Sequence, residues 1–289
     1  MAEILNITDE EYRALPGINS TMLQAFYESP DHALLERRAK QVFTNGTAFE
    51  DLVWWKVYND RSKFDARFFV ADLGTPPDKI IQAIESGKHL VDLEVLTAKG
   101  ERNGRNATLH AWIDACQDNP GRKPLSRDEF NTLDRMAENL VGMDLDGPAG
   151  DIIANCDWQV PVTWERRGIK KKALIDLVLR VGDETYIYDL KAYASLGMFR
   201  QTLKSKAWLQ ATHYTEGANA VWGGTVHPMV FLVAEKAEPY LAQPFRVHPD
   251  SMEAAEMRYL SLCDDFIAWD YAGRPARGYK FLEEVKLWF

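Results

Sequence analysis

The sequence predicts an α/β fold in which a central mixed β-sheet is flanked by helices. Two β-prone runs, Ala173 to Val181 and Thr185 to Tyr193, flank the turn signal Gly182-Asp183-Glu184 and indicate a hairpin. Apolar residues recur at helical spacing on either side of this hairpin, in Gly46 to Tyr58 and in Met252 to Tyr271. No repeat, low-complexity tract or linker interrupts the 289 residues, so we expect one domain, 1–289.

The first 145 residues are predicted to be mostly helical. Thr8 and Glu11 form a capping-box pattern at the start of a helix, and Pro16-Gly17 ends that helix. The other elements expected here are helices in Asn19 to Tyr27, from about Asp31, and in Gly46 to Tyr58, Thr108 to Gln117 and Ser126 to Val141, a strand in Phe68 to Ala71, and a weakly periodic excursion in Leu73 to Asn106.

Residues 150–247 are predicted to hold the sheet, and residues 250–289 a C-terminal helix and tail. Outside the hairpin, β-prone runs lie in Ile152 to Trp164, Met229 to Ala234 and Leu241 to Val247, the last of these as an edge strand. A helical pattern in Gln201 to Ala220 separates the hairpin from the later strands. This alternation of strands and helices is what predicts a mixed sheet.

Composition and charge limit the class of protein. No apolar run approaches the roughly 20 residues that span a membrane, and the first residues lack the pattern of a secretory signal, so we expect a cytoplasmic protein. Cys116, Cys156 and Cys263 have neither metal-site nor disulfide spacing. The net charge of −9 argues against extended electrostatic binding of nucleic acid but leaves room for a local basic stripe.

Two aspartates occupy the predicted hairpin. A leading glycine favours a two-residue turn at Gly182-Asp183, and the resulting register places Asp176 directly opposite Asp189. Facing Cβ atoms in such a pair lie roughly 4.5–5.5 Å apart, and like charges at that separation repel each other. A cation offsets the repulsion, and paired carboxylates with nearby carbonyls suit Mg²⁺ or Mn²⁺. The hairpin therefore predicts a divalent-metal site.

Lys191 follows Asp189 by two residues, so its side chain projects from the same face of the strand. A lysine beside a metal-bound carboxylate can orient a water molecule or stabilise developing negative charge, as metal-assisted phosphodiester hydrolysis requires. The alternative is a hairpin without a site, because aspartates near hairpins are common. A register shifted by one residue would place the two carboxylates on opposite faces.

Two helices add polar side chains to this set. Glu50, in Gly46-Thr47-Ala48-Phe49-Glu50, is a carboxylate in an otherwise apolar helix. Gln210 and Tyr214 are four residues apart and therefore share one helix face. The order along the chain is helix-Glu, strand-Asp, strand-Asp-x-Lys and helix-Gln-x-x-x-Tyr.

This order resembles the PD-(D/E)xK nuclease superfamily, and more narrowly its RecB-like and lambda-exonuclease-like branch, which carries the Gln-x-x-x-Tyr motif. The similarity to RecE-type exonucleases runs from about Tyr12 to the C-terminus. It includes Ile18-Asn19-Ser20-Thr21, Ser29-Pro30-Asp31-His32, Gly46-Thr47-Ala48-Phe49, Leu96-Thr97-Ala98-Lys99-Gly100 and Pro124-Leu125-Ser126. The resemblance implies a restriction-endonuclease-like core.

The same resemblance implies a role for each site residue. Asp176, Asp189, the carbonyl of Leu190 and Glu50 would bind Mg²⁺, for which Mn²⁺ substitutes. Lys191 would position the attacking water. The remaining pair, Gln210 and Tyr214, would hold the lysine or the terminal phosphate of the DNA.

Two positions depart from the family pattern. RecE itself has a histidine where this chain has Glu50. Lambda exonuclease has a glutamate at the equivalent helix, as this chain does, and a carboxylate is the harder ligand for Mg²⁺. Several relatives have an acidic residue where Gln159 stands, which leaves the contribution of Gln159 open.

Basic residues supply candidate contacts to DNA. Arg37 and Arg38 lie near the Ser-Pro element, and Lys170-Lys171-Lys172 leads into the aspartate strand. Each group could contact phosphates, and each could equally be a solvated surface.

The resemblance implies a Mg²⁺-dependent exonuclease that digests one strand of duplex DNA from its 5′ end and leaves a 3′ single-stranded tail. A RecT-type annealing protein would be the partner, and a homo-oligomeric ring, trimeric or tetrameric, would enclose the DNA. Phage or prophage origin is what the resemblance suggests. Two alternatives stay open: an endonuclease of the same superfamily acting in restriction or repair, and a DNA-binding protein that retains the fold without catalysis.

Overall fold

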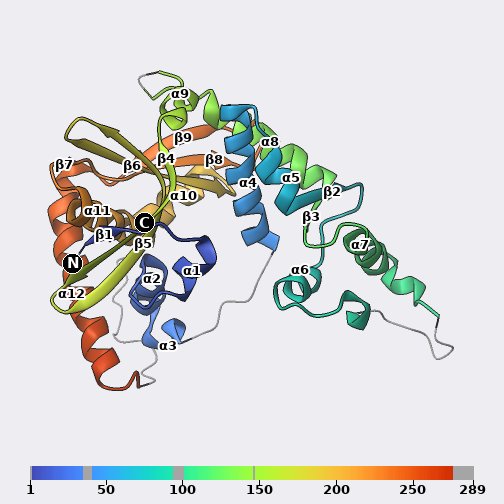
Figure 1. The fold of residues 1–289 in the computed structure, drawn as a ribbon, viewed down its shortest axis with the longest axis horizontal. Coiled ribbons are helices and arrows are strands. Elements are labelled where there is room, and N and C mark those ends of the chain that lie inside the picture. The colour runs from blue at the N-terminus through green and yellow to red at the C-terminus, as the bar shows by residue number, and fades with distance from the viewer. Residues whose placement is uncertain (1, 35–40, 94–100, 146, 276–289) are drawn as a thin grey trace, which may run out of the picture.

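The computed structural model describes residues 2–34, 41–93, 101–145 and 147–275 (Figure 1). Its main sheet has seven strands, in the order β1 (Glu3–Ile4), β4 (Asp157–Arg166), β5 (Ile169–Val181), β6 (Glu184–Tyr193), β8 (Val230–Glu235) and β9 (Ala242–Arg246), with β7 (Thr225–Val226) also paired to β6. Strand β6 runs parallel to β7 and β8, and the other neighbours are antiparallel. The predicted α/β fold with a mixed sheet is confirmed.

Helices cover both faces of this sheet (Figure 1). On one face α11 (Trp208–Trp222) packs with α2 (Ser20–Glu28) and α12 (Pro249–Tyr271) over a core that includes Val162, Ile175 and Phe231. On the other face α4 (Gln41–Tyr58), α8 (Arg127–Val141) and α9 (Ala149–Ala154) pack over a core that includes Phe49, Leu177 and Leu232. The chain crosses between β6 and β8 through α10 (Leu196–Thr202), a π-helical turn (Leu203–Ala207) and α11.

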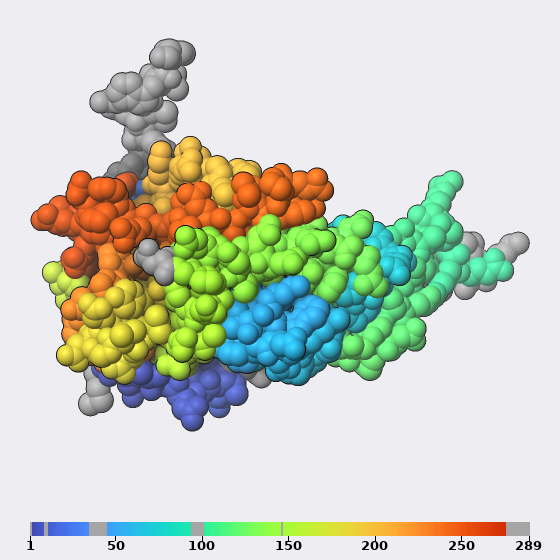
Figure 2. All heavy atoms as spheres, turned by 90° about the horizontal axis from the view of Figure 1, so that it is seen from above, coloured from blue at the N-terminus to red at the C-terminus, as the bar shows by residue number. Residues whose placement is uncertain are grey.

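A lobe extends from the end of the molecule at which α8 lies (Figures 1 and 2). It contains the parallel pair β2 (Phe68–Ala71) and β3 (Lys123–Ser126), with α6 (Asp78–Glu85) and α7 (Ala107–Gln117). Phe69, Ile80 and Trp112 form its core. The excursion predicted for Leu73 to Asn106 therefore contains a helix, because Ile80 and Ile81 are buried on one face of α6. Residues 94–100 lie outside the described residues.

The predicted helix starts are confirmed by their capping contacts. The Thr8 side chain accepts from the Glu11 amide at 3.2 Å, and Asn19 accepts from the Met22 amide at 2.8 Å, so α1 (Asp9–Ala14) and α2 begin as expected. Two further short helices are α3 (Pro30–Ala33), capped by Ser29, and α5 (Ser62–Arg67).

One strand prediction is wrong at its start. The run from Ile152 to Trp164 begins as helix α9, and β4 starts only at Asp157. Pro148 precedes α9 and Ile153 packs in the core beside α4, so burial of an apolar pair on a short helix replaces strand pairing there. Among the helices within the described ranges, none is long and apolar enough to cross a lipid bilayer.

The hairpin between β5 and β6 has the predicted turn. Leu177 pairs with Tyr188 and Val181 with Glu184, which is the register of a two-residue turn. Gly182 has a φ of +60°, which a type II′ turn requires at its first position and which glycine adopts without strain.

Candidate metal and active centre

Asp176 lies where the regular ladder of β5 is interrupted. The β5–β6 pairing begins only at Leu177, the residue after Asp176, and the β4–β5 pairing omits Gln159 and Asp176 between paired neighbours. Gln159 has a φ of +51°, in the left-handed region. The β5–β6 ladder keeps the predicted register, but Asp176 and Asp189 are not themselves among its paired residues. The ladder stops beside the irregularity of β4, and bulges are common near functional sites.

The interruption also exchanges the faces that β5 presents. Ala173 and Ile175 lie in the core beneath α11, whereas Leu177 and Leu179 lie in the core beside α4. Residues two apart share a face in a regular strand, so the exchange occurs at Asp176. The carboxylate of Asp176 is consequently within electrostatic reach of groups from both helical layers.

Asp189 is held from two sides. It is 1% exposed and forms an ion pair with Lys191, whose side chain is 31% exposed. The Gln210 amide of α11 donates to Asp189 Oδ1 at 2.5 Å. Strand β6 thus directs Asp189 and Lys191 toward α11, as the two-residue spacing predicts.

Glu50 approaches from the opposite layer. It lies on α4, and its pKa is raised well above its usual range by burial and by the nearby charge of Asp176. The Gln159 amide donates to Glu50 Oε2 at 3.2 Å and also hydrogen-bonds Asp176. Gln159 therefore connects the two carboxylates, a function that its neutral side chain did not indicate in the sequence.

Two more predicted residues adjoin this group. The Leu190 amide donates to Asp176 Oδ2 at 3.0 Å, which fixes that carboxylate against β6. Tyr214, on the same helix as Gln210, keeps its proton because burial and the charges of Asp189 and Asp176 raise its pKa well above the usual range. The predicted set from α4, β5, β6 and α11 is thus brought together in one place.

Glu50, Asp176, Asp189 and Lys191 together are called the acidic centre below. Burial first, and then the charge of Asp189, raises the pKa of Asp176 to about 7. Burial also raises the pKa of Asp189, against the opposing effect of Lys191. Burial alone would lower the pKa of Lys191, but Asp189, Asp176 and Glu50 raise it, so the ammonium form persists. Three carboxylates share one cation, which leaves two negative charges uncompensated when all are ionised.

A divalent cation fits the charge and the donors of the acidic centre. Carboxylate oxygens and backbone carbonyls are the ligands that Mg²⁺ and Mn²⁺ prefer, and a charge of +2 balances the excess. Within the described ranges, however, no three His, Cys, Asp or Glu side chains lie close enough to hold one ion by themselves. A metal would therefore need carbonyl or water ligands or a closer approach of the carboxylates.

Of the lysines predicted to contact DNA, two are buried and one is exposed. Lys171 is 1% exposed and donates to Glu216 at 2.7 Å, and Lys172 is 5% exposed and donates to the carbonyls of Tyr12, Arg13 and Leu15. Neither lysine is available to DNA, so the predicted DNA contact is wrong for both. The alternative, that they lie in a solvated turn, is also wrong, because both are buried in strand β5. Lys170 is exposed and stays a candidate. Arg37 and Arg38 lie outside the described residues.

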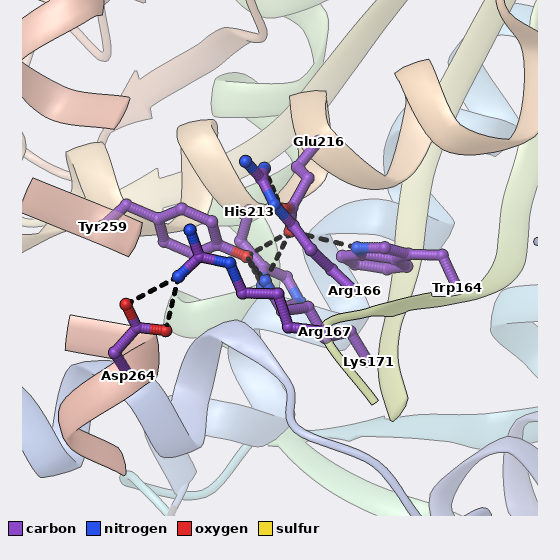
Figure 3. A network of polar contacts seen from close by, with 8 residues as sticks. All are labelled: Trp164, Arg166, Arg167, Lys171, His213, Glu216, Tyr259 and Asp264. Carbon is purple, nitrogen blue, oxygen red and sulfur yellow. Dashed lines mark hydrogen bonds and ion pairs between the residues drawn. The ribbon is translucent and has the colours of Figure 1, made fainter. Parts of the chain in front are cut away.

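A second buried polar cluster explains the burial of Lys171 (Figure 3). Glu216 Oε2 accepts from Lys171 at 2.7 Å, from the Tyr259 hydroxyl at 2.6 Å and from Trp164 Nε1 at 3.0 Å, while Oε1 accepts from Arg166 at 2.7 Å. Although burial opposes ionisation, these donors lower the pKa of Glu216 to about 2. The cluster is called the Glu216 network below.

His213 adjoins the Glu216 network. Its Nε2 lies 3.0 Å from the carbonyl of Lys172 and its Nδ1 lies 2.9 Å from the Tyr259 hydroxyl. Burial lowers the pKa of His213 to about 4, so the ring is neutral near pH 7. His213 packs inside the fold, and its two ring nitrogens contact Tyr259 and Lys172, not the acidic centre.

No protein-family model matches the chain, and no curated protein matches it. Among solved structures, the chain is similar to a presumed exonuclease from Eubacterium rectale, with 14% sequence identity and a TM-score of 0.48. That similarity covers 90% of this chain and 88% of the other.

Proposed function

We propose that this protein is a metal-dependent nuclease that hydrolyses phosphodiester bonds of DNA at the acidic centre. The observation that supports the proposal is the uncompensated charge: three confined carboxylates with raised pKa values surround a single lysine. A structural cluster gains nothing from such repulsion, whereas a metal and a phosphate need this combination of charges.

The residues of the acidic centre take distinct parts in this proposal. Glu50, Asp176, Asp189 and the Leu190 carbonyl would hold Mg²⁺ or Mn²⁺, which activates water and stabilises the charge of the reacting phosphate. Because its pKa is raised, Lys191 acts as a cation and hydrogen-bond donor to the phosphate oxygens and not as a base. Gln210 fixes Asp189, and Tyr214 offers a phenol that keeps its proton.

The finer proposal is a 5′→3′ exonuclease on double-stranded DNA ends that leaves 3′ single-stranded tails for recombination. It rests on the sequence resemblance described above. The same resemblance suggests a RecT-type annealing partner and a homo-oligomeric ring. An endonuclease and a non-catalytic DNA-binding protein are the competing functions.

Linear duplex DNA labelled at either the 5′ or the 3′ end tests the proposal. It is incubated with Mg²⁺, with Mn²⁺ or with EDTA, next to a covalently closed circle. The variants are Lys191→Ala and, as a matched control, Lys123→Ala, whose partner is Glu85 on the distant lobe. We expect early metal-dependent loss of the 5′ label, retained in Lys123→Ala and absent in Lys191→Ala and on the circle.

Other outcomes separate the alternatives. Earlier loss of the 3′ label overturns the proposed polarity but keeps the nuclease. Cutting of the circle indicates an endonuclease. No cutting with either metal overturns the nuclease and leaves a DNA-binding protein.

A further inference from the structure

A groove of about 530 Å³ opens between α10, the π-helical turn, β9 and the N-terminal half of α12. Four basic side chains, Arg200, Lys204, Arg246 and Arg258, line it, and Leu203 and Phe245 contribute apolar surface. These six residues define the cationic groove. No part of the proposed function above uses it.

The charges of the cationic groove are uncompensated. All four basic residues are exposed, and within the described part of the chain none of them forms an ion pair with a carboxylate. Among the described residues, no Asp or Glu lines the groove, and Asp250 lies at its edge, 3.6 Å from His248. In a protein with a net charge of −9, such a grouping favours an anionic ligand.

Neighbouring groups hold two of the arginines in place. The Arg258 guanidinium donates to the Tyr27 hydroxyl at 2.6 Å and lies 5.6 Å from the centre of the Trp208 ring. The Arg200 guanidinium lies 5.9 Å from the centre of the Phe245 ring. These contacts restrict the arginines without neutralising them, so their positive charge faces the groove.

The N-terminal end of helix α12 adds to the positive potential of the cationic groove. Val247, His248 and Ser251, at the start of the 23-residue helix α12, also line the groove. The positive end of the helix dipole favours an anion at such a position, although Pro249 has no amide and the amides of Asp250 and Ser251 already donate to His248. The groove therefore combines phosphate-binding groups along its rim with an apolar floor.

We propose that the cationic groove binds a segment of single-stranded DNA, with phosphates at Arg200, Lys204 and Arg246 and unpaired bases against Phe245 and Leu203. Basic rims with aromatic floors are the common means of holding unpaired strands, whereas duplex DNA hides its bases. This inference rests on the proposed function, because it supposes that DNA is the substrate. It replaces the basic surface that the buried Lys171 and Lys172 cannot form.

One helix, α11, separates the cationic groove from the acidic centre. Trp208 borders the groove and Gln210 contacts Asp189, and both belong to the first turn of α11. Residues two apart project in nearly opposite directions from a helix. A DNA strand that leaves the acidic centre would therefore need to pass around helix α11, about 10–12 Å across, to reach the groove.

Metal-free binding tests the inference without cleavage. Fluorescence anisotropy with a labelled twelve-nucleotide oligo(dT) in EDTA, over a range of salt, compares Arg200→Ala/Arg246→Ala with the control Lys88→Ala/Arg105→Ala. The control removes two exposed basic residues of the distant lobe. We expect the groove variant to bind at least about 10-fold more weakly, and its salt slope to fall by about 1.4 if two phosphate contacts are lost.

Equal affinity and equal salt slope in the two double variants would overturn the assignment. Inorganic phosphate, dTMP and the oligonucleotide then compete for the probe in the wild-type protein. Preference for the oligonucleotide over dTMP at equal nucleotide concentration supports a strand, and equal competition by dTMP overturns it in favour of a mononucleotide site. Thermal unfolding of both double variants checks that these exposed substitutions leave the fold intact.

The two proposals fail separately. If DNA is cleaved normally but the groove variant binds like its control, only the cationic groove is wrong. If no metal supports cleavage but the groove variant binds weakly, only the nuclease is wrong.

Discussion

Helix α11 contributes to two buried clusters that differ in how many carboxylates and cations they bring together. In the Glu216 network, one carboxylate faces Lys171 and Arg166, and its pKa is lowered to about 2. In the acidic centre, three carboxylates share Lys191 and their pKa values are raised. The negative charge of Glu216 is fully compensated within the fold, and Arg166, the second cation, is partly exposed to solvent. The acidic centre keeps a charge that folding does not neutralise, and we infer that a ligand does so.

Neutralising Asp176 should have the largest effect: the protein should become more stable and cleave DNA far more slowly. Asp176→Asn removes a repulsive charge but preserves an acceptor for the Leu190 amide, so we expect the unfolding free energy in EDTA to rise by about 1 kcal/mol. Cleavage should fall at least about 10³-fold, because a metal ligand is lost. Denaturant unfolding and nuclease rates measure the two effects. A variant that is less stable and equally active would remove the distinction between the clusters.

Breaking the Glu216 network should have the opposite result. Lys171→Met leaves a buried carboxylate without its closest cation, and loss of one partner of a buried pair costs about 3–5 kcal/mol. The adjacent Lys170→Met is the matched control, because Lys170 is exposed and such changes usually stay within about 0.5 kcal/mol. Urea unfolding compares them. Similar losses in both variants would contradict the buried ion pair.

Mild acid should weaken the fold through His213. Its pKa is about 4 when folded and 6.5 when free, so the unfolded chain binds the extra proton between these values. The contribution of His213 to stability is complete above about pH 6.5 and falls by roughly 2–3 kcal/mol as the pH decreases to 4. Glu216 loses its contribution only at lower pH, between 4.5 and about 2. Protonation of the carboxyls of Asp176, Asp189 and Glu50, whose pKa values are raised, stabilises the fold over the same range. The test is therefore the difference in unfolding free energy between the wild type and His213→Gln from pH 7 to pH 4, and a difference that does not change with pH would refute the prediction.

Packing beside the Glu216 network gives the smallest expected effect. A Cβ at Gly217 would lie 2.8 Å from Cζ3 of Trp164, so Gly217→Ala should cost about 1–3 kcal/mol by overpacking. Gly46→Ala is the control, because a Cβ at Gly46 meets no atom within 4 Å in helix α4. Thermal unfolding should show a loss for the first and none for the second. Equal unfolding temperatures of the two variants would contradict the contact between Gly217 and Trp164.

The features that the sequence predicted well are local. Gly182 determines the hairpin register, and Thr8, Asn19 and Ser126 start helices through contacts with residues three positions away. Period-2 spacing likewise placed Lys191 beside Asp189. These interactions need only neighbouring residues, so sequence patterns contain them.

The features that the sequence did not predict join distant segments. The left-handed backbone of Gln159 lies where the β4–β5 pairing omits Asp176, and Glu216 pairs with the buried Lys171 from 45 positions away. The cationic groove unites residues from 200 to 258, each of which resembles an ordinary surface residue when read alone. Burial and charge balance at these places depend on the finished fold.

The parallel pairing of β6 with β8 has a consequence for the order in which the protein folds. The β5–β6 hairpin closes through two residues, whereas Asp189 meets Phe231 of β8 only after the chain has crossed through α10 and α11. Short loops close sooner than long ones. We expect the hairpin to form early and its aspartates to stay hydrated until docking of α11 brings Gln210 to Asp189. The repulsion within the acidic centre would then slow only the last step of folding.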